Sequence, residues 1–162
     1  MRKMNAETKQ EKEVEEAEWI DNSVQAGFTR LYKEGNFGEV VLVGWAYVEY
    51  MIDLFMVQEF GIKHDDNERR KAVMEFLEEI DFEDKWSFLK KLDLFTDDEK
   101  KSISTFQNQR NKLFHNRLFN NPNYYGPIGR KKLMGLAKDA FFATYHAFGR
   151  KYIKDLDIKE YM

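Results

Sequence analysis

Apolar residues recur every three or four positions along most of this chain, a spacing that places them on one face of an α-helix. The first such segment spans roughly residues 8–33, and its acidic start, EKEVEEAE, suits either the positive end of a helix dipole or a solvated surface. GNFG, residues 35–38, then interrupts the pattern, as glycine and asparagine commonly do. The apolar face of this first segment consists of Trp19, Ile20, Val24, Phe28 and Leu31.

The most apolar run follows, VVLVGWAYVEYMIDLFMV at residues 40–57, within a helix expected to reach about Phe60. Its length approaches that of a membrane span. However, Glu49 and Asp53 lie inside the run, and a carboxylate at the middle of a bilayer is costly. A buried core helix is therefore the favoured interpretation, and no membrane association is expected.

Two shorter helices are expected next. Asp66 or Asn67 caps a helix that extends to about Glu79, and Asp81 caps a second, shorter one. The inward face of the first consists of Val73, Phe76, Leu77 and Ile80, and that of the second of Trp86, Leu89 and Leu92.

TDDE, residues 96–99, has capping-box spacing and opens a helix that ends in QNQRNKLFHNR, residues 107–117. NNPNYYGPIG, residues 120–129, contains both prolines and predicts a loop. A last helix spans about 131–155, and its inward residues are Leu133, Ala137, Ala140, Phe141, Phe148 and Tyr152.

No alternating strand pattern occurs, so the sequence predicts an all-α fold. We expect a single-domain bundle of about five helices over residues 16–156, after a polar tail or frayed helix start over 1–15. The 14 Phe, 8 Tyr and 3 Trp among 162 residues can supply a core without disulfides. The absence of Cys excludes a thiolate nucleophile and every Cys-based metal site.

The net charge of −3 argues against a surface wholly devoted to nucleic acid, so any contact with RNA requires a local basic patch. The first residues contain no apolar signal-peptide region, and a cytoplasmic location is expected.

Arg110 stands out in the predicted helix that starts near residue 97. At about 100° per residue, with Ile103 at 0°, Phe106, Leu113 and Phe114 form one apolar stripe that Leu118 extends, and Arg110 falls inside it at about 340°. Asn111 and His115 lie together on the edge of the stripe.

An unpaired guanidinium in a dry core costs several kcal/mol. We therefore expect Arg110 to face Glu49 or Asp53, which are equally out of place on one face of the apolar helix. A buried ion pair that fixes the register of an otherwise unrelated bundle is the structural alternative.

His115 has a structural alternative too, because a histidine near a helix C-terminus often compensates the dipole. His64 and His146 lie elsewhere, and no two histidines have metal-ligand spacing, so neither a metal nor a cofactor is expected. The sequence also lacks GxSxG, GxxxxGK[ST] and GxGxxG, which removes the common hydrolase, P-loop and dinucleotide-binding interpretations.

The segment RNKLFH, residues 110–115, resembles the R-x4-6-H motif of HEPN domains, including the polar residue that commonly follows the arginine. The context is similar as well, with the motif near the end of a late helix, one further helix after it and an acidic residue in an earlier helix. The resemblance covers roughly residues 15–155.

The resemblance implies a metal-independent endoribonuclease in which the motif helices of a homodimer form one composite site. Its products would be a 2′,3′-cyclic phosphate and a 5′-hydroxyl. Many members are toxins or defence effectors, which makes a cognate antitoxin or a nucleotidyltransferase a candidate partner besides RNA. Other members are inactive dimerisation, RNA-binding or protein-binding modules, and that alternative stays open.

Under this interpretation His115 serves as general acid or base, since histidine titrates near neutral pH. Arg110 stabilises the charge of the transition state, and Asn111 orients the histidine or the phosphate. Glu49 or Asp53 supports Arg110. The residues expected to bind RNA, with ordinary surface as the alternative, are Lys112, Arg117, Arg130, Lys131 and Lys132 for phosphates and Tyr124 and Tyr125 for bases.

Overall fold

The computed structural model describes residues 24–63, 65–115 and 129–152. They form a helical segment over 24–34 and five further helices, α2 (Phe37–Glu59), α3 (Asn67–Glu78), α4 (Phe82–Lys91), α5 (Asp97–His115) and α6 (Arg130–Tyr152). No strand occurs in these ranges, and the all-α prediction is confirmed. There are six helical segments rather than about five, and the two short helices expected after the apolar run are the separate helices α3 and α4.

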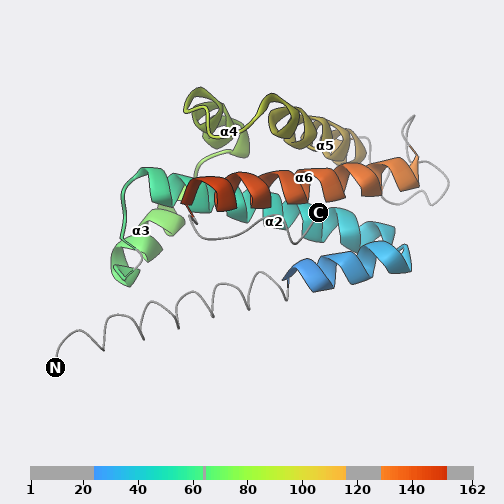
Figure 1. Ribbon diagram of the computed structural model, residues 1–162, viewed down its shortest axis with the longest axis horizontal. Helices are drawn as coiled ribbons and strands as arrows, with labels where there is room; N and C mark the ends of the chain where they lie inside the picture. The colour runs from blue at the N-terminus through green and yellow to red at the C-terminus, as the bar shows by residue number, and fades with distance from the viewer. Residues whose placement is uncertain (1–23, 64, 116–128, 153–162) are drawn as a thin grey trace.

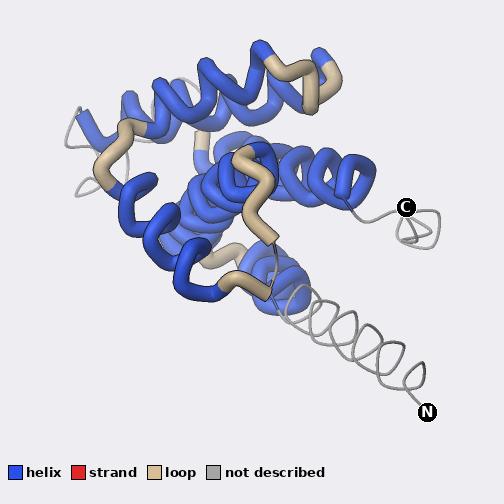
Figure 2. The backbone as a smooth tube through the Cα atoms, turned by 90° about the vertical axis from the view of Figure 1, so that its left-hand side faces the viewer, coloured by secondary structure: helices blue, strands red, loops and turns tan. Residues whose placement is uncertain are grey.

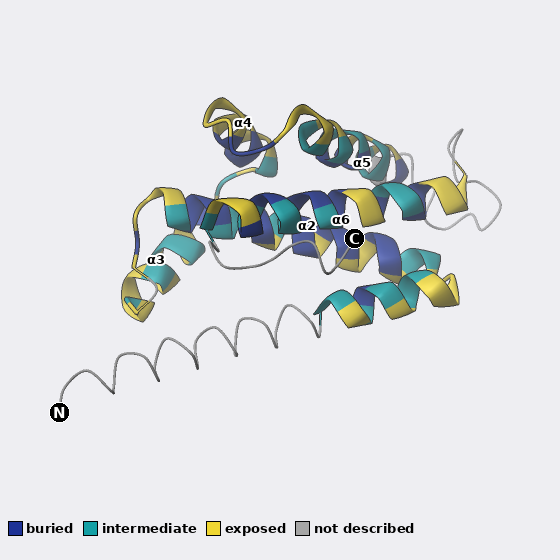
Figure 3. Cartoon of the chain, in the orientation of Figure 1, coloured by how far each residue is buried: buried dark blue, intermediate teal, exposed yellow. Residues whose placement is uncertain are grey.

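The two 23-residue helices, α2 and α6, form the centre of the fold. They lie side by side, with α4 and α5 on one side and the segment 24–34 on the other (Figure 1). The view turned by 90° shows the same order of layers (Figure 2). Buried residues concentrate where α2, α5 and α6 face one another (Figure 3).

Gly44 sets how closely α2 approaches its neighbours. A Cβ at this position would lie 3.1 Å from Cε2 of Phe28 and 3.4 Å from Cβ of Ala137. The missing side chain therefore lets the segment 24–34 and α6 pack tightly on α2. Phe28 continues this contact by stacking on Phe141 of α6, with ring centroids 4.4 Å apart.

Predicted caps hold the short-range structure. The side chain of Asp66 accepts a hydrogen bond from the Arg69 amide at 3.1 Å. At the start of α5 the Thr96 amide donates to Glu99 Oε2 at 2.8 Å, and the Glu99 amide donates to Thr96 Oγ1 at 3.3 Å, which is the predicted capping box. Asp81 precedes α4 as predicted but makes no side-chain cap.

Two side chains predicted to face inward do not. Phe76 is 56% exposed, and Leu92 lies just after α4 and is also exposed. Phe76 lies within a short helix and Leu92 directly follows one, and the inward face of each helix is only a few residues wide, so Leu77 and Leu89 fill the available contact. Of the inward face predicted for the helix over 8–33, Val24, Phe28 and Leu31 are buried or partly buried, and Trp19 and Ile20 lie outside the described residues. The inward face predicted for α6 is confirmed as buried or partly buried.

The C-terminal end of α6 is tied to two other helices. Arg150 donates to both carboxylate oxygens of Glu99, at 2.9 and 2.8 Å, and to the carbonyl of Leu94 at 3.3 Å. Tyr152 donates a short hydrogen bond to Glu59 at the end of α2. Burial, and secondarily this bond to Glu59, raises the pKa of Tyr152. These contacts fix the end of α6 against α5 and α2.

Helix α2 is the one described helix that is long and apolar enough to cross a bilayer. In its most apolar window 61% of the residues are buried in the bundle. This is weak evidence for a membrane span, because a core helix has the same length and composition.

Candidate functional site

The candidate site begins with the inward stripe of α5. Ile103, Phe106 and Leu113 are buried, as the helical wheel predicted, and they hold α5 against α6 and α2. Arg110 lies among them but is only half-buried. Its side chain is therefore not fully enclosed, although the guanidinium Nε is buried.

The side chain of Arg110 rests on an aromatic ring of α2. Its guanidinium carbon lies 4.6 Å from the centroid of Trp45, a cation–π contact of about 1 kcal/mol or more when partly desolvated. Its Nη1 donates a hydrogen bond to Oδ1 of Asn111 at 3.0 Å. The ring and the amide together restrict where the positive charge lies.

Trp45 is itself held firmly. Its ring lies 4.7 Å from Phe82 and 5.8 Å from Phe106, so residues of α2, α4 and α5 converge on it. Only 5% of Trp45 is exposed, and its Nε1 has no acceptor among the described residues. Arg110 consequently lies on a rigid aromatic surface.

Burial and charge act in opposite directions on Arg110. Burial lowers the pKa of Arg110, and the negative charge of Glu49 acts to raise it. A guanidinium stays protonated at physiological pH despite such a shift. Glu49 is thus the acidic residue of α2 whose charge acts on Arg110, consistent with one of the two predicted partners.

Asp53, the other predicted partner, is engaged elsewhere. Lys85 Nζ of α4 donates to Asp53 Oδ1 at 2.6 Å and to the carbonyl of Leu77 at 3.2 Å, and both side chains of the ion pair are largely buried. Burial raises the pKa of Asp53, while the bond from Lys85 acts to lower it. Asp53 therefore serves to dock α4 on α2, and of the two predicted partners it is Glu49 whose charge acts on the Arg110 guanidinium.

Asn111 and His115 occupy the last turns of α5. Asn111 is half-buried and accepts the hydrogen bond from Arg110. His115 is the final residue of α5, four positions after Asn111, so the backbone places both on the same side of the helix. The side chain of His115 lies outside the described residues.

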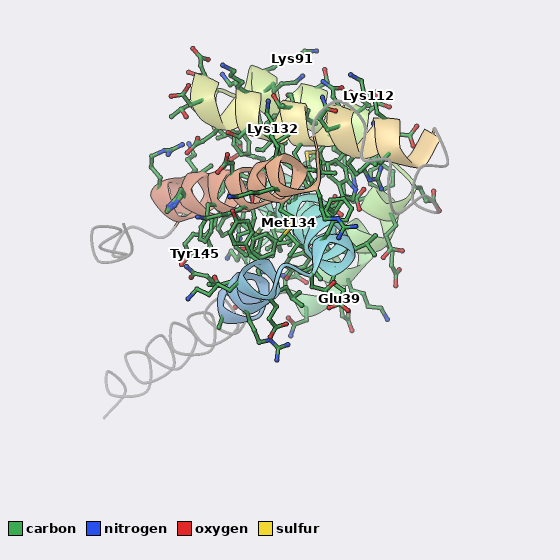
Figure 4. All side chains as sticks on the ribbon, turned by 90° about the vertical axis from the view of Figure 1, so that its right-hand side faces the viewer. Glu39, Lys91, Lys112, Lys132, Met134 and Tyr145 are labelled. Carbon is green, nitrogen blue, oxygen red and sulfur yellow. The ribbon has the colours of Figure 1, made fainter. Side chains whose placement is uncertain are left out.

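A group of basic residues lies at the same end of the bundle. Helix α5 ends toward the side of the bundle on which α6 begins (Figure 1), and Figure 4, which views the bundle from that side, labels Lys112 and Lys132. Lys112 and Lys132 are exposed, as are Arg130 and Lys131, and the guanidinium of Arg130 lies 5.5 Å from the Phe37 ring centroid. The other residues predicted to bind RNA, Arg117, Tyr124 and Tyr125, lie outside the described residues.

Three side chains near the site were not anticipated. Trp45 carries Arg110, Lys85 neutralises Asp53, and buried Gln107 donates to Oε1 of Glu83 at 2.9 Å. Trp45 lies four residues before Glu49, so the two lie on the same side of α2, and this spacing could have identified Trp45 as a neighbour of Arg110. The other two pairings join residues more than twenty positions apart, which periodicity alone does not reveal.

Neither a cluster of metal ligands nor a relative identifies the site. Among the residues that the structure describes, no group of three or more His, Asp or Glu side chains could hold a metal ion. Comparison with family models, with curated proteins and with solved structures finds no match. The functional argument therefore rests on the residues of this chain.

Proposed function

We propose that this protein is an endoribonuclease of the HEPN type that cleaves single-stranded RNA without a metal, at a site completed by a second copy of the chain. The observation that supports this most is the placement of Arg110. It lies half-buried on Trp45, bonded to Asn111 and five positions before His115. A role as toxin or defence effector follows from the resemblance to that family.

RNA supplies its own nucleophile, the 2′-hydroxyl. In the proposed reaction neutral His115 accepts the 2′-hydroxyl proton as the 2′-oxygen attacks the adjacent phosphorus. The bond from phosphorus to the 5′-oxygen then breaks, and a protonated histidine returns a proton to the leaving oxygen. The products are a 2′,3′-cyclic phosphate and a 5′-hydroxyl.

Arg110 stabilises the charge that develops on the phosphorane. A planar guanidinium matches phosphate oxygens, and one that is already held in place loses little conformational freedom when the reaction occurs. Trp45 and Asn111 supply this restraint, and Glu49 keeps the local charge balance. The exposed basic residues at the same end of the bundle bind the phosphates on either side.

The alternative is a catalytically inactive HEPN-like module that dimerises or binds RNA or a protein. Its support is that the Arg110–Asn111 hydrogen bond and the contact with Trp45 already make a stable structural network. In that case the arginine orders the end of α5 without meeting substrate.

Cleavage of mixed single-stranded RNA in EDTA tests the proposal. We expect wild type and His146→Ala to cleave it and to leave cyclic-phosphate ends, while His115→Ala is at least about 10²-fold slower, as is usual for loss of a general acid or base. His146, a half-buried histidine of α6, is the matched control. Absence of cleavage by wild type over a wide range of concentrations would favour the inactive module, and equal cleavage by all three would indicate a contaminating nuclease.

Arg110→Lys keeps a positive charge but loses the planar fork, and Arg69→Lys on the exposed face of α3 is its control. We expect Arg110→Lys to remain folded and to cleave at least tenfold more slowly. An unfolded Arg110→Lys protein, together with fully active His115→Ala, would mean that Arg110 is a core ion-pair residue only.

A further inference from the structure

Helix α2 carries an apolar stripe that no described segment covers. Leu42 and Tyr50 are each 50% exposed, and Val43 and Ala46 between them are exposed as well. The spacing of four between Leu42, Ala46 and Tyr50 places them in one row along the helix. We refer to Leu42, Val43, Ala46 and Tyr50 as the α2 stripe.

The same face of α2 is covered further along the helix. Asp53 is closed off by Lys85, and Val57 is almost fully buried where α3 and α4 pack on α2. Among the described residues, the outer face of α2 is thus covered in its C-terminal half and exposed in its N-terminal half. The bare half is the part next to the candidate site, because Trp45 and Glu49 border it.

We propose that the α2 stripe is the contact by which a second copy of this chain joins the first, with the two α2 helices antiparallel about a two-fold axis at Ala46. The proposal rests on the proposed function, because it says which surface completes the composite site.

The stripe is complementary to itself in this register. Leu42 lies four residues before Ala46 and Tyr50 four residues after it, so an antiparallel pair places each Leu42 against the partner's Tyr50. Ala46 meets Ala46 of the partner subunit, and two small side chains permit helix axes to approach to about 8 Å. The Tyr50 ring covers leucine while its hydroxyl remains at the edge in water.

The register also decides where the two sites lie. Around α2 at about 100° per residue, Glu49 and Trp45 lie about 60° and 100° from Ala46 in the same direction. A two-fold axis perpendicular to the two antiparallel helices therefore places Trp45 and Glu49 of both chains on the same side of the helix pair. Both Arg110 side chains therefore border one cleft, as a composite site requires.

The α2 stripe is short. Its four residues span only about 12 Å of the helix, at 1.5 Å per residue. A stable interface buries about 800 Å² of each partner, which is more surface than four side chains provide. We therefore expect dimers that dissociate on dilution in the micromolar range, with neighbouring residues of α5 adding to the contact.

The chain contains no cysteine, which permits a test of register with single cysteines in the full-length protein. Under mild oxidation we expect Ala46→Cys to form a disulfide-linked dimer. Ala72→Cys, at an exposed alanine of α3, should remain monomeric as the matched control. Leu42→Cys should cross-link at least tenfold more slowly than Ala46→Cys, because antiparallel Leu42 residues lie about 12 Å apart along the axis.

Sedimentation of the unmodified chain provides the second measurement. We expect Ala46→Arg to raise the dimer dissociation constant at least tenfold, while Phe76→Arg on exposed α3 leaves it unchanged. Monomeric wild type at about 100 µM, or equal cross-linking of Ala46→Cys and Ala72→Cys, would overturn the proposal. Rapid cross-linking of Leu42→Cys would overturn the antiparallel register.

Neither measurement uses RNA, so the two hypotheses fail separately. A dimer with the expected cross-links that never cleaves RNA would contradict the proposed activity alone. Cleavage by a protein that shows none of these cross-links would contradict the α2 interface alone.

Discussion

The guanidinium of Arg110 lies over the indole ring of Trp45, with its central carbon 4.6 Å from the ring centroid. This contact joins the helix that carries the candidate motif to the central helix of the bundle. It also explains how a cation is accommodated beside a largely apolar stripe, because an aromatic face offers electrostatic attraction without a second charge. The position of Arg110 should therefore depend on Trp45.

Replacement of Trp45 by Leu tests that dependence. We expect kcat for RNA cleavage to fall about tenfold with KM nearly unchanged, because Arg110 loses the surface that positions it. Trp45→Phe, which keeps an aromatic face, should recover part of the loss. Assays are made well below the melting temperature of each variant.

Trp86→Leu is the matched control, since Trp86 is an equally buried indole of α4. Both leucine variants should lose about 3 kcal/mol of stability, typical of a truncated core aromatic. Equal losses of kcat in the two would show that Trp45 acts on activity only through general stability.

The buried Asp53–Lys85 pair should dominate the docking of α4. Lys85→Met leaves a carboxylate without its partner in a largely buried position, and we expect the free energy of unfolding to fall by about 3 kcal/mol. The double variant Asp53→Leu, Lys85→Met should recover most of that loss, because no charge then remains buried. Urea unfolding of the two single variants and the double variant measures the coupling, and additive losses would contradict a direct interaction.

The Glu99–Arg150 pair should make stability depend on pH. Burial alone would raise the pKa of Glu99, but hydrogen bonds from Arg150 and Thr96 outweigh it and hold the pKa below the ordinary value of 4.5. The unfolded chain has the ordinary value, so this contribution is complete above pH 4.5 and is lost as the pH falls through the lower value of the folded state.

Thermal melts of wild type and Glu99→Gln test this. We expect the variant to be about 1 kcal/mol less stable at pH 7, after allowance for the partly exposed Arg150, with the difference disappearing as the pH falls below the pKa of Glu99 in the folded state. Glu75→Gln, which removes an exposed ion pair with Lys71, is the control and should change little at either pH. A Glu99→Gln effect that is independent of pH would point to lost helix capping alone.

The basic end of the bundle should control RNA affinity through salt. Lys131→Ala with Lys132→Ala should weaken binding and should reduce the slope of log K against log salt by about 1.4, from about 0.7 for each phosphate contact on a single strand. Lys63→Ala with Lys91→Ala removes the same charge from exposed positions elsewhere. Equal effects of the two pairs, measured by fluorescence anisotropy, would show that only net charge matters.

Local structure could be predicted from the sequence because its causes are local. The Thr96–Glu99 capping box, the Asp66 cap and the inward face of α6 depend on residues a few positions apart. The helical wheel also placed Arg110 among the buried residues of the α5 stripe, although it did not predict the intermediate exposure of its side chain.

Pairings between helices could not be predicted in this way. The sequence placed Glu49 and Asp53 on one face of α2, but periodicity does not reveal which helix covers each position, and Lys85 was overlooked. The exposure of Phe76 has a related cause. A helical wheel gives the direction of a side chain, but it does not show how much of that face the adjacent helix covers. The location of the arginine was thus predictable, whereas its aromatic support was not.

The side-chain volumes that positions 28, 44 and 137 accept depend on one another, because all three meet at Gly44. With Cε2 of Phe28 only 3.1 Å from a hypothetical Cβ, a methyl group at 44 can be accepted only if the Phe28 ring shifts, whereas Ala137 at 3.4 Å would be in van der Waals contact. A library randomised at 28, 44 and 137 should therefore enrich compensating combinations, in which alanine at 44 accompanies a smaller residue than phenylalanine at 28. Substitutions at these three positions would then set how far α2 lies from the segment 24–34 and from α6.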